Sequence, residues 1–251
     1  MFISFKINKT FLLCLCIAAA IAMAILPAKM FRADDVPAIA GQKTVYLTFD
    51  DGPSKVTEGL LDVLAKHDVK ATFFVTAQSP DSFESIRRAD AEGHLIALHT
   101  YTHEFADIYK NSDAFWDDIG KLNDVVYELT GKHSSYLRFP GGSSNSVGRK
   151  YGGDNLMREL AGECEERGIT YYDWNVDTKD ALGGKKPASL IASNAIKGVQ
   201  NKSNAIVLMH DASYNSTVAE ATDLIISELK NEGYVFDTLD HLSEPVHHNL
   251  T

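Results

Sequence analysis

Short apolar runs alternate along the chain with longer segments in which apolar residues recur at helical spacing. The short runs are rich in β-branched and aromatic residues and end at turn residues, as buried strands do. They predict strands over residues 45–49, 71–75, 94–98, 136–139, 169–174, 205–209 and 234–236. The longer segments predict amphipathic helices over residues 54–64, 82–92, 112–130, 156–167 and 218–231, and one more that begins at Pro187.

This alternation of strands and helices predicts an α/β protein. Parallel neighbouring strands need a long crossover connection, which is usually a helix. The sequence therefore predicts about seven parallel strands. An open doubly wound sheet and a barrel both fit this order of elements, and no second folded domain, repeat or low-complexity segment is evident.

The N-terminal region differs from the rest of the chain. Residues 11–28 form an uncharged, mostly apolar run that follows Lys6 and Lys9, which is typical of an export signal or a membrane anchor. The body is then expected outside the cytoplasmic membrane, secreted or anchored by this segment, with no other membrane contact. We divide the chain into a signal peptide or anchor over residues 1–33, a linker over 34–42 and a catalytic domain over 43–245.

The charge balance narrows the range of partners. The chain has 24 Lys and Arg against 34 Asp and Glu, a net charge of −10, with a pI near 5.3. Residues 1–33 hold four basic and no acidic side chains, so the remainder carries −14. A protein that binds nucleic acid needs a basic face to neutralise phosphates, so no nucleic-acid partner is expected. The pattern leaves the oligomeric state open.

Cysteine and asparagine patterns add little to this picture. Cys14 and Cys16 lie in the apolar segment, which leaves Cys164 without a partner for a disulfide in the body. Asn201 and Asn215 each begin an Asn-x-Ser/Thr pattern, the weakly specific motif of glycosylation acceptors.

Titratable residues follow most of the predicted strands. In parallel α/β proteins, chemistry gathers at the carboxyl ends of the strands, which share one edge. Any one of these residues alone could be structural, but their convergence from five strands predicts a functional site. In chain order they are Asp50 and Asp51, His99 and His103, Arg138, Asp177 and Asp180, and His210 and Asp211.

Three of these side chains can form a metal site. His99 and His103 have a spacing that places two imidazoles one helical turn apart, able to meet at one ion. Asp51 or Asp50 can supply a third ligand from the same edge. Two histidines and one carboxylate leave positions open, as catalytic metal sites do.

The remaining groups indicate acid–base roles. Of two adjacent carboxylates, one would bind the metal, and the other would take a proton from metal-bound water, whose pKa the metal lowers. Arg138 can pair with the second carboxylate and keep it ionised. His210 follows an apolar run near a possible Asp partner, which is the profile of a general acid.

Five motifs occur in order over roughly residues 43–240. They are Thr48-Phe-Asp-Asp-Gly, His99-Thr-x-x-His, Arg138-Phe-Pro-Gly-Gly, Asp177-x-x-Asp and Leu208-Met-His-Asp. In these motifs the chain resembles the polysaccharide deacetylases of carbohydrate esterase family 4. The first two motifs in this order are a specific signal, whereas the last two are weak alone. The resemblance implies a distorted (β/α) barrel of about seven strands.

The resemblance also implies an activity and residue roles. The activity is hydrolysis of N-acetyl groups on GlcNAc-type residues, which yields acetate and a free amine. One divalent metal ion, commonly zinc, with cobalt, manganese or nickel as alternatives, would be bound by Asp51, His99 and His103. The other roles would fall to Asp50 as the base, Arg138 holding it, His210 as the acid, Asp180 tuning His210, and Gly141 and Leu208 facing the oxyanion and substrate.

Two positions depart from the family pattern. Gly141 and Ala181 stand where relatives often carry an aromatic residue that lines the acetyl or sugar pocket. The resemblance therefore implies a more open pocket, or one filled by Trp174 or Tyr101.

We expect a metal-dependent deacetylase that acts on cell-wall peptidoglycan, by analogy with exported single-domain relatives. Two other hypotheses stay open. An O-acetyl esterase or another acyl hydrolase would use the same metal and water chemistry. A non-catalytic glycan-binding protein would be expected to lose a ligand or the base, and none is lost here. Whether the substrate is GlcNAc, MurNAc or a chitin-like oligomer is also open.

Overall fold

The computed structural model describes residues 42–250, so the predicted signal or anchor and nearly all of the predicted linker lie outside the described residues. The strands are β1 (Thr44–Asp50), β2 (Thr72–Val75), β3 (Leu95–Leu98), β4 (Tyr136–Leu137), β5 (Thr170–Tyr171), β6 (Val176–Asp177), β7 (Asn204–His210) and β8 (Val235–Phe236). The α-helices are α2 (Thr57–Lys66), α3 (Glu84–Ala91), α4 (Phe105–Ile108), α5 (Ser112–Thr130), α6 (Ser146–Gly152), α7 (Leu156–Glu166), α8 (Ala188–Val199) and α9 (Val218–Asn231), with short 3₁₀ turns at Pro80–Ser82 and Leu239–His241.

All the strands that the structure describes pair in parallel, in the order β5-β4-β3-β2-β1-β7-β6, and β8 adds to the start of β1. The longest pairing joins β1 to β7, from Thr44 opposite Asn204 to Asp50 opposite His210. β5 and β6 end the series without pairing with each other, so the sheet is an open, distorted half-barrel. The predicted α/β class and distorted barrel are confirmed.

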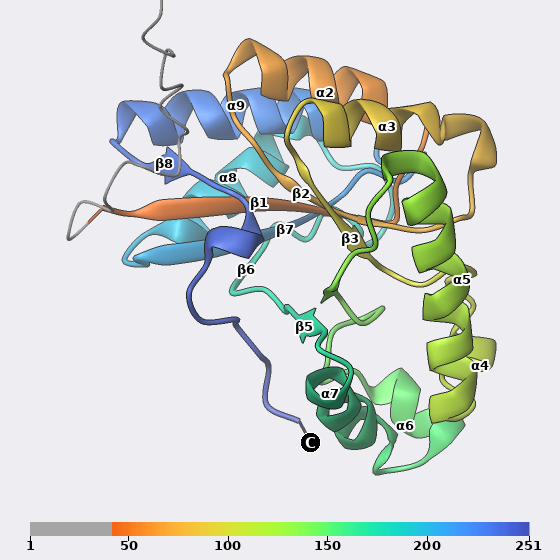
Figure 1. Ribbon diagram of the computed structural model, residues 1–251. Coiled ribbons are helices and arrows are strands. Elements are labelled where there is room, and N and C mark those ends of the chain that lie inside the picture. The colour runs from red at the N-terminus through yellow and green to blue at the C-terminus, as the bar shows by residue number, and fades with distance from the viewer. Residues whose placement is uncertain (1–41, 251) are drawn as a thin grey trace, which may run out of the picture. The chain divides into compact units, whose positions relative to one another are not determined.

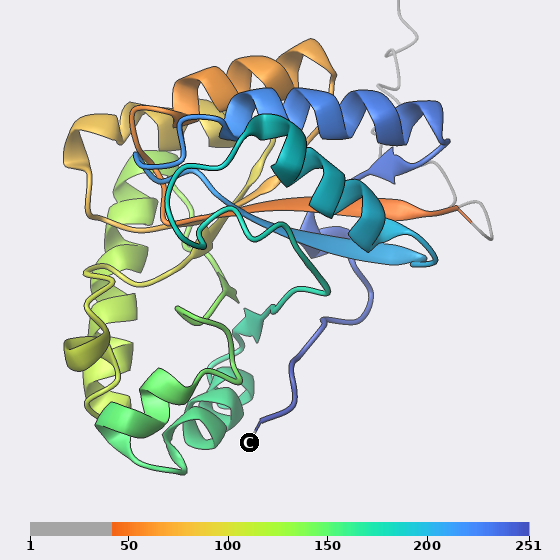
Figure 2. The ribbon, with the colours of Figure 1, turned by 180° about the vertical axis from the view of Figure 1, so that it is seen from behind.

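The two faces of the sheet are covered by different parts of the chain. Helices α2, α3 and α9 lie along one face, and the C-terminal segment crosses the other (Figures 1 and 2). Successive side chains of β1 point to opposite faces, so Leu47 joins the larger core under the helices and Tyr46 joins a smaller core with Leu239 and Leu242. Burial on both faces explains why the strands read as continuous apolar runs.

The structure departs from the predicted elements in four places. One is the two-residue strand β6, which lies outside the predicted strands and pairs with β7. The strand predicted over 169–174 is only β5, because Asp173 donates its backbone N–H to Val246 in the C-terminal segment. The helix predicted from residue 54 begins at Thr57, since the Ser54 hydroxyl donates to the Asp211 carbonyl. The short helices α4 and α6 have too few turns to give a helical period in the sequence. Within residues 42–250, no helix is long and apolar enough to cross a bilayer.

Candidate active site

The loops after β1 and β3 bring three of the predicted metal ligands together. Asp51, His99 and His103 each offer one ligand atom, and these atoms lie within 4.8 Å of one another. The Asp51 Oδ1 is 3.1 Å from the His103 Nε2 and 3.5 Å from the His99 Nε2. The pairing of β1 with β2, and of β2 with β3, places these loops side by side.

The backbone that positions these ligands is not helical. His99 to His103 form a loop, so the predicted helical turn is wrong. Thr100 and His103 instead have φ values of 82° and 55°, and Asp51 has a φ of 69°. Non-glycine residues seldom adopt the left-handed region, and such residues tend to cluster at functional sites. The Asp118 carboxylate holds the loop by accepting the Tyr101 backbone N–H at 2.5 Å.

The protonation of His99 suits metal binding. The His99 Nδ1 is 2.8 Å from the Arg138 carbonyl oxygen, which can only accept, so Nδ1 carries the proton and Nε2 keeps a lone pair. Burial lowers the pKa of His99, which favours the neutral ligand form. Burial is the largest single influence on Asp51 and His103 as well and opposes their charge. Their mutual hydrogen bond and the opposite charges nearby together outweigh it, lowering the pKa of Asp51 and raising that of His103.

Asp50 lies beside this cluster and is held by Arg138. The Arg138 Nη1 donates to the Asp50 Oδ1 at 2.8 Å, and the other carboxylate oxygen, Oδ2, is 3.8 Å from the His99 Nε2. The guanidinium is fully buried and stacks over the Phe74 ring at 4.1 Å. The structure thus brings together Asp50 and Arg138, which the sequence predicts to be the base and its partner.

His210 and Asp180 form a second acid–base pair on the same edge. The His210 Nδ1 is 2.9 Å from the Asp180 Oδ1, and the backbone N–H of His210 donates to Oδ2 at 2.8 Å. Burial alone would lower the pKa of His210, but the hydrogen bond and charge of Asp180 outweigh it and raise that pKa to about 9. The raised pKa favours the protonated imidazole, which can donate a proton.

The remaining residues named from the sequence differ in their surroundings. Gly141 has a φ of 80°, and no acceptor for its N–H occurs in the described part of the chain. Leu208 is buried in β7, and Asp177 is exposed. Trp174 lies next to this glycine turn, because a Cβ on Gly142 would sit 2.9 Å from its ring.

Two residues that the sequence analysis does not assign to the site also touch it. The Tyr214 hydroxyl lies 3.4 Å from the Asp51 Oδ2, and its side chain is half exposed. Asn215 donates from its side chain to the Asp180 Oδ2 at 2.6 Å and is buried. Its only sequence signal is the glycosylation pattern, which burial of the side chain makes unusable. Neither contact is readable from spacing, since each depends on how the loop after β7 folds back.

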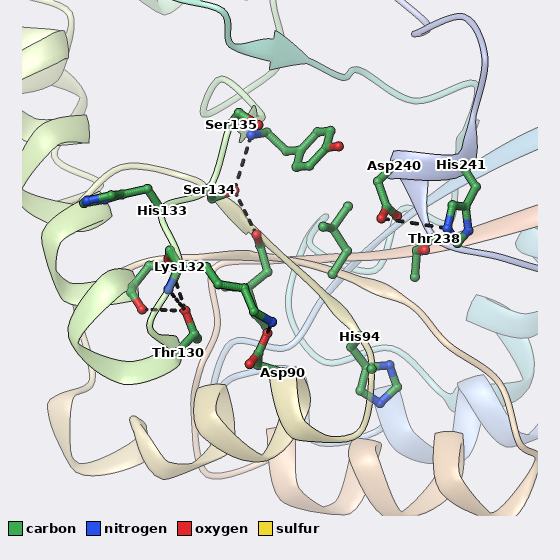
Figure 3. Close-up of a pocket in the computed structure, with 15 residues that line it drawn as sticks. Asp90, His94, Thr130, Lys132, His133, Ser134, Ser135, Thr238, Asp240 and His241 are labelled. Carbon is green, nitrogen blue, oxygen red and sulfur yellow. Dashed lines mark hydrogen bonds and ion pairs between the residues drawn. The ribbon is translucent and has the colours of Figure 1, made fainter. Parts of the chain in front are cut away.

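A separate pocket of about 370 Å³ lies at the amino ends of β3 and β4. Figure 3 shows its lining, which includes His94, His133 and His241. It contains none of the predicted site residues, which lie at the carboxyl ends of the strands, as Asp50 and His210 do at the ends of β1 and β7.

Comparisons with known proteins agree with this arrangement. Residues 38–156 match the family model described as polysaccharide deacetylase. The chain is 34% identical to a peptidoglycan N-acetylglucosamine deacetylase of Bacillus cereus, over 78% of this chain and 69% of that one. It is 35% identical to a peptidoglycan N-acetylmuramic acid deacetylase of Bacillus subtilis, over 80% and 72%.

Solved structures give the same result. The catalytic domain of a peptidoglycan N-acetylglucosamine deacetylase from Eubacterium rectale superposes with a TM-score of 0.81 at 39% identity, covering 88% of this chain and 98% of that one. The polysaccharide deacetylase Bc1974 of Bacillus cereus gives 0.72 at 32% identity, covering 83% and 99%. The chain therefore belongs to the polysaccharide deacetylase family and is a hydrolase of carbon–nitrogen amide bonds.

Proposed function

We propose that this protein removes the N-acetyl group from GlcNAc residues of peptidoglycan, outside the cytoplasmic membrane, with the help of one divalent metal ion. The observation that carries the proposal is the joint presence of three metal donors, a carboxylate held by Arg138 and an imidazole held by Asp180 along one sheet edge. The likeness to the GlcNAc deacetylase of Eubacterium rectale supports this choice of sugar.

Asp51, His99 and His103 fit a divalent metal. Their donor set, two imidazoles and one carboxylate, is typical of catalytic zinc sites, and the His99 tautomer leaves its Nε2 free to coordinate. Cobalt, manganese and nickel can accept the same donors. When bound, the metal would polarise the acetyl carbonyl and lower the pKa of water.

Asp50 is the proposed general base. Its Oδ1 is held by Arg138, so Oδ2 faces the metal ligands and can accept a proton from the water that attacks the acetyl carbon. The Gly141 N–H, on a left-handed turn, is free to donate to the carbonyl oxygen as that oxygen gains negative charge.

His210 is the proposed general acid. Asp180 holds its Nδ1, so the opposite ring nitrogen, Nε2, is left to donate a proton to the sugar nitrogen as the carbon–nitrogen bond breaks. The water oxygen ends in acetate, and the sugar keeps a free amine. One proton passes to Asp50 and one is delivered by His210, so the charge on the two groups is restored by proton exchange with solvent.

The test is acetate release by the full-length protein from peptidoglycan and from GlcNAc oligomers. Metal-stripped protein, protein restored with zinc or cobalt, and the Asp50→Asn variant are compared. We expect metal-dependent release that Asp50→Asn abolishes, with peptidoglycan the better substrate.

Two further arms separate the competing functions. Release from O-acetylated but not N-acetylated glycan would indicate an esterase. Glycan binding without release, by protein shown to contain metal, would indicate a binding protein and overturn the proposal.

A further inference from the structure

Asn215 lies behind the proposed acid pair and is almost fully buried, with 2% of its surface exposed. Its side-chain amide donates to the Asp180 Oδ2 at 2.6 Å and to the His210 carbonyl oxygen at 2.8 Å. Its backbone N–H donates to Ala212, and its carbonyl accepts from Val218 at the start of α9. The loop after β7 is thus folded so that one amide group bridges both members of the pair.

These contacts complete the hydrogen bonding of the Asp180 carboxylate. Oδ1 accepts from the His210 Nδ1, while Oδ2 accepts from the His210 backbone N–H and from Asn215. Three donors on two oxygens fix the plane of the carboxylate. Because the imidazole follows that plane, the direction of the His210 Nε2 depends on the carboxylate staying in place.

We propose that Asn215 is a positioning residue for the general acid, holding Asp180 so that the imidazole of His210 points at the leaving nitrogen. The inference rests on the proposed function, because it acts through the role given to His210. The donor must be neutral, since a second anion at this position would repel Asp180.

The test uses full-length, zinc-loaded protein and two variants, assayed for acetate release across pH. Asn215→Ala removes the donor, and we expect kcat to fall about ten- to a hundredfold with little change in KM, part of the roughly 100- to 10,000-fold that a general acid contributes. Asn215→Asp keeps the shape. The introduced carboxyl group can donate to Asp180 only while protonated, so the ratio of its kcat to that of wild type should fall as pH rises.

The acidic groups around the imidazole are unchanged in both variants. They are Asp180, in the loop after β6, and Asp50 and Asp51 at the end of β1. A change in the pH profile is therefore traceable to position 215.

Asn123→Ala is the matched control. Asn123 also makes two side-chain hydrogen bonds, both to the Ser134 backbone at the other end of the strands. The Asn123→Ala substitution should lower the unfolding temperature without changing the dependence of kcat on pH.

The outcomes separate the two proposals. Wild-type protein that releases no acetate contradicts the proposed function. An active wild type whose Asn215→Asp variant keeps a constant kcat ratio across pH, or whose folded Asn215→Ala variant keeps kcat, overturns the role of Asn215. Should Asn215→Ala fail to fold, the Asn215→Asp profile decides alone.

Discussion

Arg138 is a fully buried guanidinium that makes four hydrogen bonds. Its partners are the Asp50 carboxylate, the Thr48 hydroxyl and the carbonyls of Tyr172 and Asp173. A buried ion pair contributes little net stability, but removing one member leaves an unpaired charge in the interior. The same side chain that aligns the proposed base therefore also affects the stability of the fold.

Replacing Arg138 with Ala should lower the free energy of unfolding by about 3–5 kcal/mol, because Asp50 loses its partner. Urea unfolding measures this change. Arg88→Ala is the comparison, since Arg88 pairs with Glu58, Asp62 and Glu92 at the surface and should cost only about 1 kcal/mol. Equal losses in the two variants would contradict the buried-charge argument.

The effect of a helical glycine on stability depends on what surrounds it. Gly59 in α2, Gly120 in α5 and Gly162 in α7 would each place a Cβ in open space. Gly198 in α8 instead faces β6, where a Cβ would lie 2.4 Å from the Val176 Cγ1. Glycine in a helix costs stability relative to alanine, unless close packing requires it.

Substituting Ala for Gly59, Gly120 or Gly162 should raise the free energy of unfolding by about 0.5–1 kcal/mol each, nearly additively because they lie on different helices. Gly198→Ala should lower it by about 1–3 kcal/mol, because the added methyl overpacks α8 against β6. Urea unfolding measures both changes in free energy as shifts of the midpoint, provided that the dependence of the free energy on urea concentration stays the same. A stabilising Gly198→Ala would show that α8 shifts freely.

His94 joins the amino ends of β2 and β3. Its Nδ1 accepts the Ala71 N–H at 3.1 Å, and the ring lies in the lining shown in Figure 3. Burial, helped by the charge of Lys70, lowers the pKa of His94 from 6.5 to about 4. The folded state thus resists protonation of this imidazole.

Because the folded pKa is depressed, the unfolded chain binds the extra proton first. The contribution of His94 to stability is complete above about pH 6.5 and is lost as pH falls toward 4. We expect His94→Gln, which can still accept the Ala71 N–H, to lose less stability than wild type between these values. Urea unfolding at several pH values gives the free energy of unfolding of both proteins as a function of pH. Parallel curves would show that His94 does not cause the loss of stability at low pH.

For the molecule as a whole, folding creates the candidate metal site, which exists only in the folded chain. Asp51 follows β1, and His99 and His103 follow β3, so their ligand atoms meet through the pairing of both strands with β2. A ligand that binds only the native state stabilises it by mass action.

Zinc at about 100 times its dissociation constant should raise the free energy of unfolding of the stripped protein by about 2.7 kcal/mol. The effect should vanish in His103→Gln, which lacks a ligand. His133→Gln changes an exposed histidine that stacks on Tyr127 and should keep the full effect. Zinc stabilisation that persists in His103→Gln would place the ion elsewhere. Thermal or urea unfolding with and without chelator measures it.

The local pattern was enough to predict the class of fold and the residues near the site. Strands buried on both faces leave apolar runs, and residues at their carboxyl ends share an edge in any parallel sheet. Asp50, Asp51, His99, Arg138 and His210 could therefore be named from the sequence, although their catalytic roles stay predictions. The His99–His103 turn was predicted wrongly, because spacing alone does not distinguish a helical turn from a left-handed loop.

By itself, then, the sequence determined the alternation of elements, the shared edge and the motifs that indicate the family, since each is carried by neighbouring residues. Only the tertiary structure decided the order of the strands, the opening between β5 and β6, and the partners of each polar atom. Asn215 reaches Asp180 from 35 positions away, and Tyr214 reaches Asp51 from 163. Such contacts arise from packing and long-range pairing, which leave no periodic trace along the chain.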